Sequence, residues 1–272
     1  MTATLTATSR ASSRNAFGAL LLRDLAVLRK EIGMFLGRTV MQPFLLIFVF
    51  AYVFPKIGQA IGGARGASEF STLLVGGVLA SVMIFQGVQA VALPLVQDFG
   101  YTREIEDRVL APMPVWAVAA EKVASGAIQA FISALVVFPL ALVIPATKVH
   151  LSVHWFYLLT ILPLSAVMAA ALGLTIGTRV EPRQVPLIFS LLVIPMTFLG
   201  AVYYPWKSLT PLPWLKVVVL INPLIYMSEG MRLSLTNNVP HMAPWAIYGA
   251  LIGFTALFMR LGIEGFKKRV LS

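Results

Sequence analysis

Residues 123–178 read VASGAIQAFISALVVFPLALVIPATKVHLSVHWFYLLTILPLSAVMAAALGLTIGT, with one lysine, Lys148, and no other Asp, Glu, Lys or Arg. A helix needs roughly 20 residues without a stranded charge to cross the hydrocarbon core of a bilayer. The apolar residues on each side of Lys148 suffice for one crossing each. This stretch therefore predicts two membrane-spanning helices that are joined near Lys148.

The whole chain contains six such long intervals between consecutive charged residues. They predict six membrane-spanning helices, at about 34–55, 71–95, 115–144, 154–178, 184–203 and 243–263. The first interval is the shortest, and we expect the Arg38 side chain to reach toward the lipid head groups. The chain is 58% hydrophobic and 12% charged, with a mean hydropathy of +0.86, which is too apolar for a soluble domain of 272 residues. The predicted fold class is an all-α membrane protein.

The distribution of basic residues predicts the orientation. If both termini are cytoplasmic, fifteen of the 21 Lys and Arg residues fall on the cytoplasmic side and six fall outside. Basic loops tend to be retained in the cytoplasm. We therefore expect a multi-pass protein of the bacterial inner membrane with both termini inside, including a basic tail at 264–272.

An amphipathic helix is expected before the first span, at 14–31. Phe17, Leu21, Leu25 and Leu28 recur at helical spacing, while charged residues occupy much of the remainder. Such a helix lies on the membrane surface, where it could anchor the chain or transmit force. The Thr-, Ser- and Ala-rich residues 1–13 are expected to form a disordered cytoplasmic tail.

The stretch 203–235 is long for a loop, yet four prolines prevent a continuous span. It predicts short re-entrant or surface half-helices before the last span. Aromatic rings in this stretch suit a membrane–water boundary, where they could anchor the protein or line an exit for an amphiphilic substrate. These residues are Tyr203, Tyr204, Trp206, Trp214 and Tyr226.

Small residues recur every four positions at Ala169, Gly173 and Gly177. They make one helix face smooth enough for close approach of another helix. The sequence does not decide whether this face packs inside the chain or against a second copy.

Several kinds of site are disfavoured by composition. The chain has no cysteine, and His150 and His154 flank a span without a nearby carboxylate, so no metal or cofactor site is expected in this chain. The net charge of +10 is spread between apolar runs, which favours anionic lipid head groups over nucleic acid as its counterpart.

If the chain takes part in transport, the energy is expected to come from another protein. No ionisable residue lies in the middle of a predicted span, as ion coupling would require, and no phosphate-binding loop ending in Gly-Lys-Ser/Thr occurs. A separate ATPase is thus implied. Its expected docking site is the densest charge cluster with the residues that follow it, namely Asp98, Arg103, Glu104, Glu106, Asp107, Arg108, Leu110 and Pro112.

Two segments carry a resemblance to a known family. The first is 103–112 with Lys122 beyond it, a charged stretch followed by Val-Leu and Ala-Pro. The second contains, in order, GAVYYP (200–205), LPWL (212–215) and NPLIY (222–226), with Arg232 beyond. Their order and spacing resemble the ABC transporter type-2 permease family, which includes drug, lipo-oligosaccharide and polysaccharide exporters. Ala111 departs from the Thr usual in that family.

The resemblance implies a permease homodimer, or a dimer with a homologous permease, bound to two ATPase subunits that hold ATP and Mg. Each ATPase would engage a short coupling helix within 98–114 and contact the amphipathic helix 14–31. The substrate would be a lipophilic drug, a lipid or a lipid-linked glycan, and this chain would not itself be an enzyme.

Two other functions remain open from the sequence. An ion-driven secondary transporter would need transport that survives ATP depletion. A lipid-modifying membrane enzyme would need clustered polar groups at one boundary, for which Glu229 with Arg232, and Glu181 between Arg179 and Arg183, are the candidates. Both groups are better explained as local charge compensation.

Overall fold

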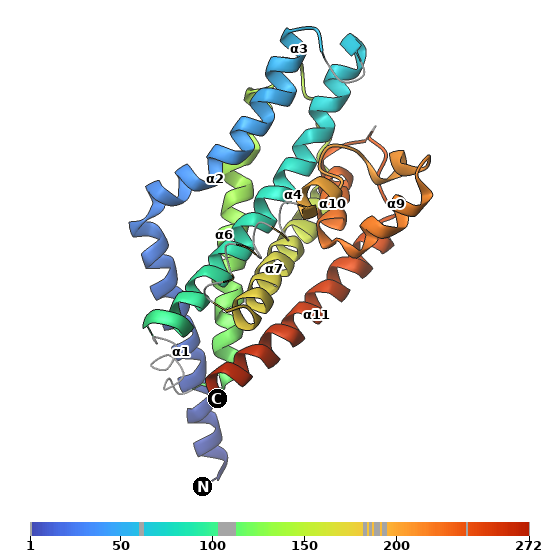
Figure 1. Ribbon diagram of the computed structural model, residues 1–272. Coiled ribbons are helices and arrows are strands. Elements are labelled where there is room, and N and C mark those ends of the chain that lie inside the picture. The colour runs from blue at the N-terminus through green and yellow to red at the C-terminus, as the bar shows by residue number, and fades with distance from the viewer. Residues whose placement is uncertain are drawn as a thin grey trace.

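The computed structural model describes residues 2–59, 63–102, 113–181, 184, 187, 191, 195–237 and 239–271. Every regular element within those residues is helical, which confirms the all-α class (Figure 1). The long helices are α1 (Thr2–Lys30), α2 (Ile32–Ile47), α4 (Gly63–Gln97), α6 (Val115–Val143), α7 (Trp155–Arg179), α10 (Pro223–Leu235) and α11 (Pro244–Leu271). The shorter elements are the π-helical turns η1 (Phe48–Val53) and η2 (Asp98–Thr102), the 3-10 turns η4 (Trp206–Leu209) and η5 (Val219–Ile221), and the helices α3 (Phe54–Lys56) and α9 (Pro213–Val218).

Five helical stretches are long and apolar enough to cross a membrane. They are Ile32–Lys56, Gly66–Gly100, Val115–Val143, Trp155–Arg179 and Pro244–Val270. The remaining expected span, 184–203, is interrupted by undescribed residues at 185–186, 188–190 and 192–194, so a total of six stays a prediction. The stretch 203–235 is broken into η4, α9, η5 and α10, and its re-entry into the membrane also stays a prediction.

The centre of the bundle is the packing of α7 against α4. A Cβ atom added to Gly173 would lie 2.9 Å from Cα of Val88, and one added to Gly87 would lie 2.6 Å from Cβ of Ala169. The two backbones approach this closely because both faces carry small residues. The small-residue face of α7 therefore packs inside the chain, which resolves the choice that the sequence left open.

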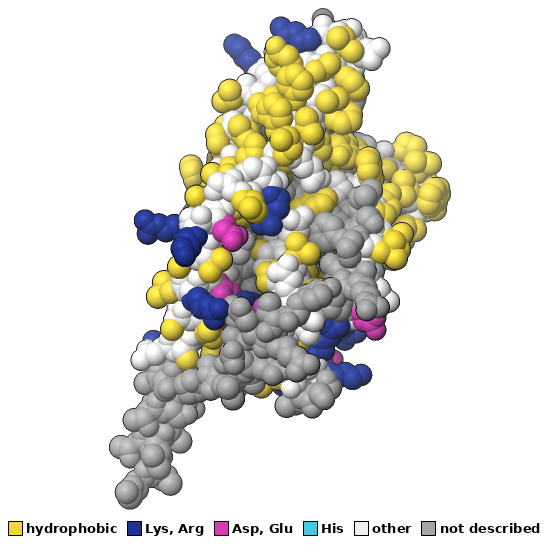
Figure 2. Space-filling model, turned by 60° about the vertical axis from the view of Figure 1, so that its left-hand side comes forward, with side chains coloured by type: hydrophobic (Ala, Val, Ile, Leu, Met, Phe, Trp, Pro, Cys, Tyr) yellow, Lys and Arg dark blue, Asp and Glu magenta, His cyan; other side chains and the backbone are white. Residues whose placement is uncertain are grey.

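The helices α6, α10 and α11 cover this central pair (Figure 1). α11 follows α7, with Gly262 against the Leu174 side chain and Gly265 against Thr178. Both chain ends lie toward the same end of the molecule, which we call the terminal end. On the face shown in Figure 2, hydrophobic side chains dominate the half away from it, apart from basic side chains at the far tip, and the other charged side chains lie nearer to it.

The first helix is longer than expected. α1 begins at Thr2, so the structure continues the amphipathic helix into residues expected to be disordered. The stretch before Gly18 contains neither Gly nor Pro, the residues that most oppose a helix. At Glu31 the backbone leaves the helical region, with φ −101° and ψ 18°, and the chain enters α2.

Candidate functional site

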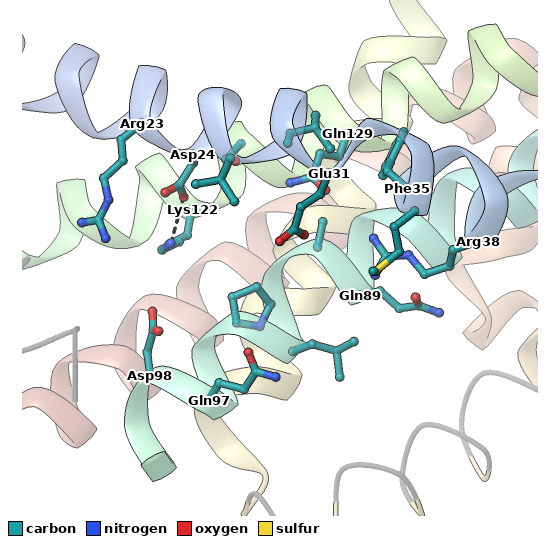
Figure 3. A pocket seen from close by; sticks show the side chains of 17 residues that line it. Arg23, Asp24, Glu31, Phe35, Arg38, Gln89, Gln97, Asp98, Lys122 and Gln129 are labelled. Atoms are coloured by element: carbon teal, nitrogen blue, oxygen red, sulfur yellow. Dashed lines mark hydrogen bonds and ion pairs between the residues drawn. The ribbon is translucent and has the colours of Figure 1, made fainter. Parts of the chain in front are cut away.

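A pocket of about 510 Å³ lies at the terminal end, where α1, α2, α4 and α6 meet (Figure 3). Charged and amide side chains from all four helices share its wall. The basic residues are Arg23, Arg38 and Lys122, the acidic residues are Asp24, Glu31 and Asp98, and the amides are Gln89, Gln97 and Gln129. We call this space the terminal pocket. Its mixed charge and its amides give it a polar character that is unusual beside membrane-spanning helices.

An ion pair ties α1 to α6 across the terminal pocket. Nζ of Lys122 donates a hydrogen bond to Oδ2 of Asp24 at 2.8 Å, and the two side chains are 5% and 14% exposed (Figure 3). A hydrogen bond to a charged group is stronger than a neutral one, and more so at low exposure. The amphipathic helix is thus attached to the bundle by a specific bond as well as by its apolar face.

The expected ATPase-docking residues divide between described and undescribed parts of the chain. Asp98 follows the end of α4 in the turn η2, is 8% exposed and lines the terminal pocket. The other seven residues lie outside the described part: Arg103, Glu104, Glu106, Asp107, Arg108, Leu110 and Pro112. Their contact with an ATPase therefore stays a prediction. The ends of the described chain that flank them, at Thr102 and Met113, belong to the segment joining α4 to α6.

A second polar cluster lies in the half of the molecule away from the terminal end. Nη1 of Arg232 donates to Oε1 of Glu229 at 2.8 Å, and both side chains are fully buried. The same Oε1 accepts the backbone N–H of Trp206 at 2.9 Å, and Oε2 accepts that of Met242 at 2.7 Å. Nη2 of Arg232 donates to the carbonyls of Ala201 and Val202. The pair fixes two segments to α10, namely 201–206 and the backbone at Met242.

This cluster requires close backbone approach from α4. A Cβ atom on Gly77 would lie 2.1 Å from the Val202 carbonyl oxygen, and one on Gly76 would lie 3.1 Å from Cγ of Arg232. Ala201 adopts a positive φ of 53°, a conformation that side chains rarely take. Burial lowers the pKa of Arg232, against the opposing effect of the Glu229 charge. The sequence interpretation of Glu229 and Arg232 as a local pair is correct, but the pair is buried and also holds the backbone.

The aromatic residues of 203–226 do not form one ring. Trp206 and Tyr226 line a second pocket of about 450 Å³, together with Trp245 of α11. The Tyr203 ring instead packs 5.7 Å from the ring of Phe50 in η1. Trp214, in α9, is 66% exposed. A side chain with that exposure suits contact with lipid or a head group.

The remaining member of the aromatic set is held by the chain itself. The Tyr204 hydroxyl donates to the carbonyl of Phe198 at 3.2 Å. Burial raises the pKa of Tyr204, and the positive charge of Arg232 opposes that rise.

Within the described ranges, no three side chains of His, Cys, Asp or Glu come together as a metal site.

The comparison with known proteins gives this arrangement a family. The model of the "ABC-2 type transporter" family matches residues 15–236. This match runs from α1 through four of the five spans and ends just after α10. The chain belongs to the ABC-2 type transporter family. As a member of that family with several membrane-spanning helices, it is a subunit of a membrane transporter.

Curated relatives agree with this ABC-2 assignment. The chain is 28% identical over 240 residues to the inner membrane transport permease YadH of Escherichia coli strain K12. The alignment covers 84% of this chain and 88% of the relative. The permease of the same name in Shigella flexneri matches to the same extent. The relatives are therefore similar in length and cover most of the ABC-2 fold described above.

Sequence reasoning missed several residues of this ABC-2 transporter. Asp24 was seen only as part of the polar face of α1, because its partner Lys122 is 98 positions away. Gln89, Gln97 and Gln129 do not interrupt the intervals that predict the spans, because an amide side chain carries no charge. A count of amides within the spans would have found them. Trp245 adjoins the aromatic set in space but lies well beyond it in the sequence.

Proposed function

We propose that this chain is the membrane-spanning subunit of an ATP-driven exporter in the bacterial inner membrane, with both termini in the cytoplasm. Two ATPase subunits, which bind ATP and Mg, would associate with two permease copies, identical or homologous. The substrate would be a lipophilic drug, a lipid or a lipid-linked glycan. The chain itself would catalyse no reaction.

One observation carries this proposal. The segment between α4 and α6, where docking is expected, is flanked in the chain by Asp98 and by Lys122 of α6, and both of these residues line the terminal pocket. A push on this segment would act directly on both helices. Through the bond between Lys122 and Asp24 it would also act on α1. The helices α1, α4 and α6 would then move as one unit.

α4 offers a path from this unit to the other half of the molecule. The helix runs from the terminal pocket at Gln97 to the close contact of Gly77 with Val202, a distance of roughly 30 Å at 1.5 Å per residue. Val202 is held in turn by the buried Arg232. A shift of α4 would therefore move the backbone beside the aromatic residues of 203–206. ATP would act by favouring one of two such arrangements.

A membrane enzyme is a weaker reading of the same structure. Glu229, which belongs to one of its two candidate groups, uses both carboxylate oxygens in hydrogen bonds to Arg232 and to two backbone N–H groups. The side chain is fully buried, so no substrate can reach it without unfolding the site. Its role is accordingly structural.

The proposal is tested by co-purification from membranes. A tagged wild-type chain is compared with a variant carrying Glu104→Lys, Glu106→Lys and Asp107→Lys. The control carries Glu264→Lys, which alters an exposed carboxylate near the terminal end. An ATPase subunit should co-purify with the wild type and the control and be lost from the triple variant. Absence of any ATPase from all three would overturn the proposal and favour an ion-driven transporter.

A further inference from the structure

A narrow polar groove continues from the terminal pocket into the region of the spans. It lies between α2 and α4, and Arg38 and Gln89 line both spaces. Beyond them the groove is lined by Thr39 and Gln42 from α2 and by Gln86 from α4, and its wall is completed by Ser81 and the apolar residues Pro43, Leu46, Val82 and Phe85. We call this space the polar groove, and its polar residues for the argument below are Arg38, Thr39, Gln42, Gln86 and Gln89. The groove has a volume of about 20 Å³, which is room for about one water molecule.

Two side chains of the polar groove have unmet hydrogen-bonding capacity. Thr39 is 2% exposed and Gln86 is 3% exposed. Considering all residues that the structure describes, neither Oγ1 of Thr39 nor Oε1 of Gln86 has a hydrogen-bond partner. A buried polar atom without a partner costs about 1–3 kcal/mol, so such atoms are normally satisfied by water or a ligand. Both atoms belong to the wall of the same groove.

The polar residues of the groove lie on the sides of α2 and α4 that face each other. On α4, Gln86, Gln89 and Gln97 recur at spacings of three and eight, which places them along one side of the helix. On α2, Arg38 and Gln42 are four residues apart. A continuous amide-lined track therefore runs from the wide terminal pocket into the narrow groove. The neighbouring side of α2 is apolar and exposed, with Met41 61% and Leu45 51% accessible.

We propose that the polar groove binds the hydroxyl-rich head group of an amphiphile whose hydrocarbon chain lies along the apolar side of α2. An amide both donates and accepts hydrogen bonds, as does a hydroxyl, so the two are matched. A charged head group would lose its hydration beyond Arg38, since none of the other groove residues carries a charge. The proposal names the substrate class for the transport function proposed above and rests on it.

The polar groove must widen to admit such a head group, and α2 contains a feature suited to that. Pro43 lines the groove and has no N–H, so the carbonyl of Thr39 receives no bond from it. One turn later α2 passes into the π-helical turn η1. Interruptions of this kind permit bending at defined points and often accompany functional sites. The head group would dock first in the terminal pocket and then enter the groove.

The test uses thiol labelling, which is convenient because the chain has no cysteine. Gln42→Cys and Gln89→Cys place a thiol in the polar groove. Met41→Cys and Leu45→Cys are controls on the neighbouring side of α2. Each variant is purified without an ATPase, placed in phosphatidylcholine nanodiscs and treated with a membrane-impermeant methanethiosulfonate reagent. Thiols in the groove should react at least about tenfold faster, because the reactive thiolate forms only where water reaches it.

The head group is then tested by protection. Dodecyl maltoside at submicellar concentration should slow labelling at positions 42 and 89, whereas dodecylphosphocholine should not. Maltose alone should also have no effect, which distinguishes an amphiphile from a free sugar. The variant Gln86→Leu, combined with Gln42→Cys, should lose the protection while keeping its thermal stability, because the amide oxygen that it removes has no partner in the described structure.

Equal labelling of positions 41 and 42 would overturn the polar groove as a water-filled site. Equal protection by the two detergents, or protection by maltose alone, would overturn the proposed ligand. Since no ATPase or ATP is present, these outcomes are independent of the co-purification that tests the exporter proposal.

Discussion

The Glu229 carboxylate lies 2.8 Å from the Arg232 guanidinium, and neither side chain is accessible to solvent. Glu229 also accepts hydrogen bonds from backbone N–H groups before and after α10, and Arg232 donates to a backbone carbonyl before it. Breaking a buried pair by removing one charge commonly destabilises a protein by about 3–5 kcal/mol, because the remaining charge stays buried. We therefore expect the stability of the protein to be sensitive to the loss of either charge of this pair.

Glu229→Gln should therefore lower the Tm strongly, by the equivalent of about 3–5 kcal/mol, since it leaves the Arg232 charge uncompensated. The matched control is Glu264→Gln, which breaks the exposed pair with Arg260. That change should have an effect of only about 0–1 kcal/mol. Thermal unfolding of the two variants in nanodiscs compares them directly, and similar Tm values would contradict a structural role for the buried pair.

Gly77→Ala should destabilise the protein by about 1–3 kcal/mol or more, because the new methyl group would meet the Val202 carbonyl. The control is Gly253→Ala in α11, where a Cβ atom has no neighbour within 4 Å. That substitution should be neutral or stabilising by up to about 1 kcal/mol. The prediction is checked by comparing thermal unfolding of the two variants. An unchanged Tm for Gly77→Ala would show that the 200–206 backbone can move away from α4.

Gly173→Leu tests the packing of α7 against α4. The larger side chain has no room beside Val88, so the folded yield and the Tm should both fall. The fraction that remains folded should keep its oligomeric mass in size-exclusion chromatography with light scattering. Gly253→Leu, on an open part of α11, serves as the control. A well-folded Gly173→Leu protein of reduced oligomeric mass would instead assign this face to an interface between copies.

Asp24→Lys should release α1 from the bundle, because it places a second positive charge beside Lys122. The lost bond belongs to a class worth about 1.5–3 kcal/mol, so amide hydrogen exchange within 14–30 should become faster by more than about tenfold. The double variant Asp24→Lys with Lys122→Asp should restore slow exchange. Arg29→Glu, which changes a charge at an exposed position of α1, should have little effect. Failure of the double variant to restore protection would argue against the ion pair as the attachment.

The membrane-spanning helices were the most predictable part of the fold. Their signal is local, because a long apolar stretch without charged residues indicates a membrane-spanning helix whatever the rest of the chain does. The stretch 123–178 predicted two spans, and the structure has α6 and α7 there. The interval at 184–203 is equally free of charge, but the described residues there are interrupted at 185–186, 188–190 and 192–194.

The polar sites were less predictable, because they depend on contacts between distant parts of the chain. Glu229 and Arg232 are three residues apart and read correctly as a pair, yet nothing local shows that Trp206 and Met242 will enclose them. The small face of α7 was visible in the sequence, but its partner on α4 was not. For Thr39 and Gln86, the unmet hydrogen bonds exist only once α2 and α4 are packed together.

The backbone contacts of Glu229 also bear on how the protein is made. One of its partners, Trp206, precedes it in the chain, while the other, Met242, follows it by 13 residues. A nascent chain that ends at Arg232 contains both charged residues of the pair. It still lacks Met242, whose backbone N–H makes the last hydrogen bond to the Glu229 carboxylate. The hydrogen bonds of Glu229 are therefore complete only once the chain has been made as far as Met242. A chain truncated between Arg232 and Met242 would hold the charged pair without the last of its backbone donors.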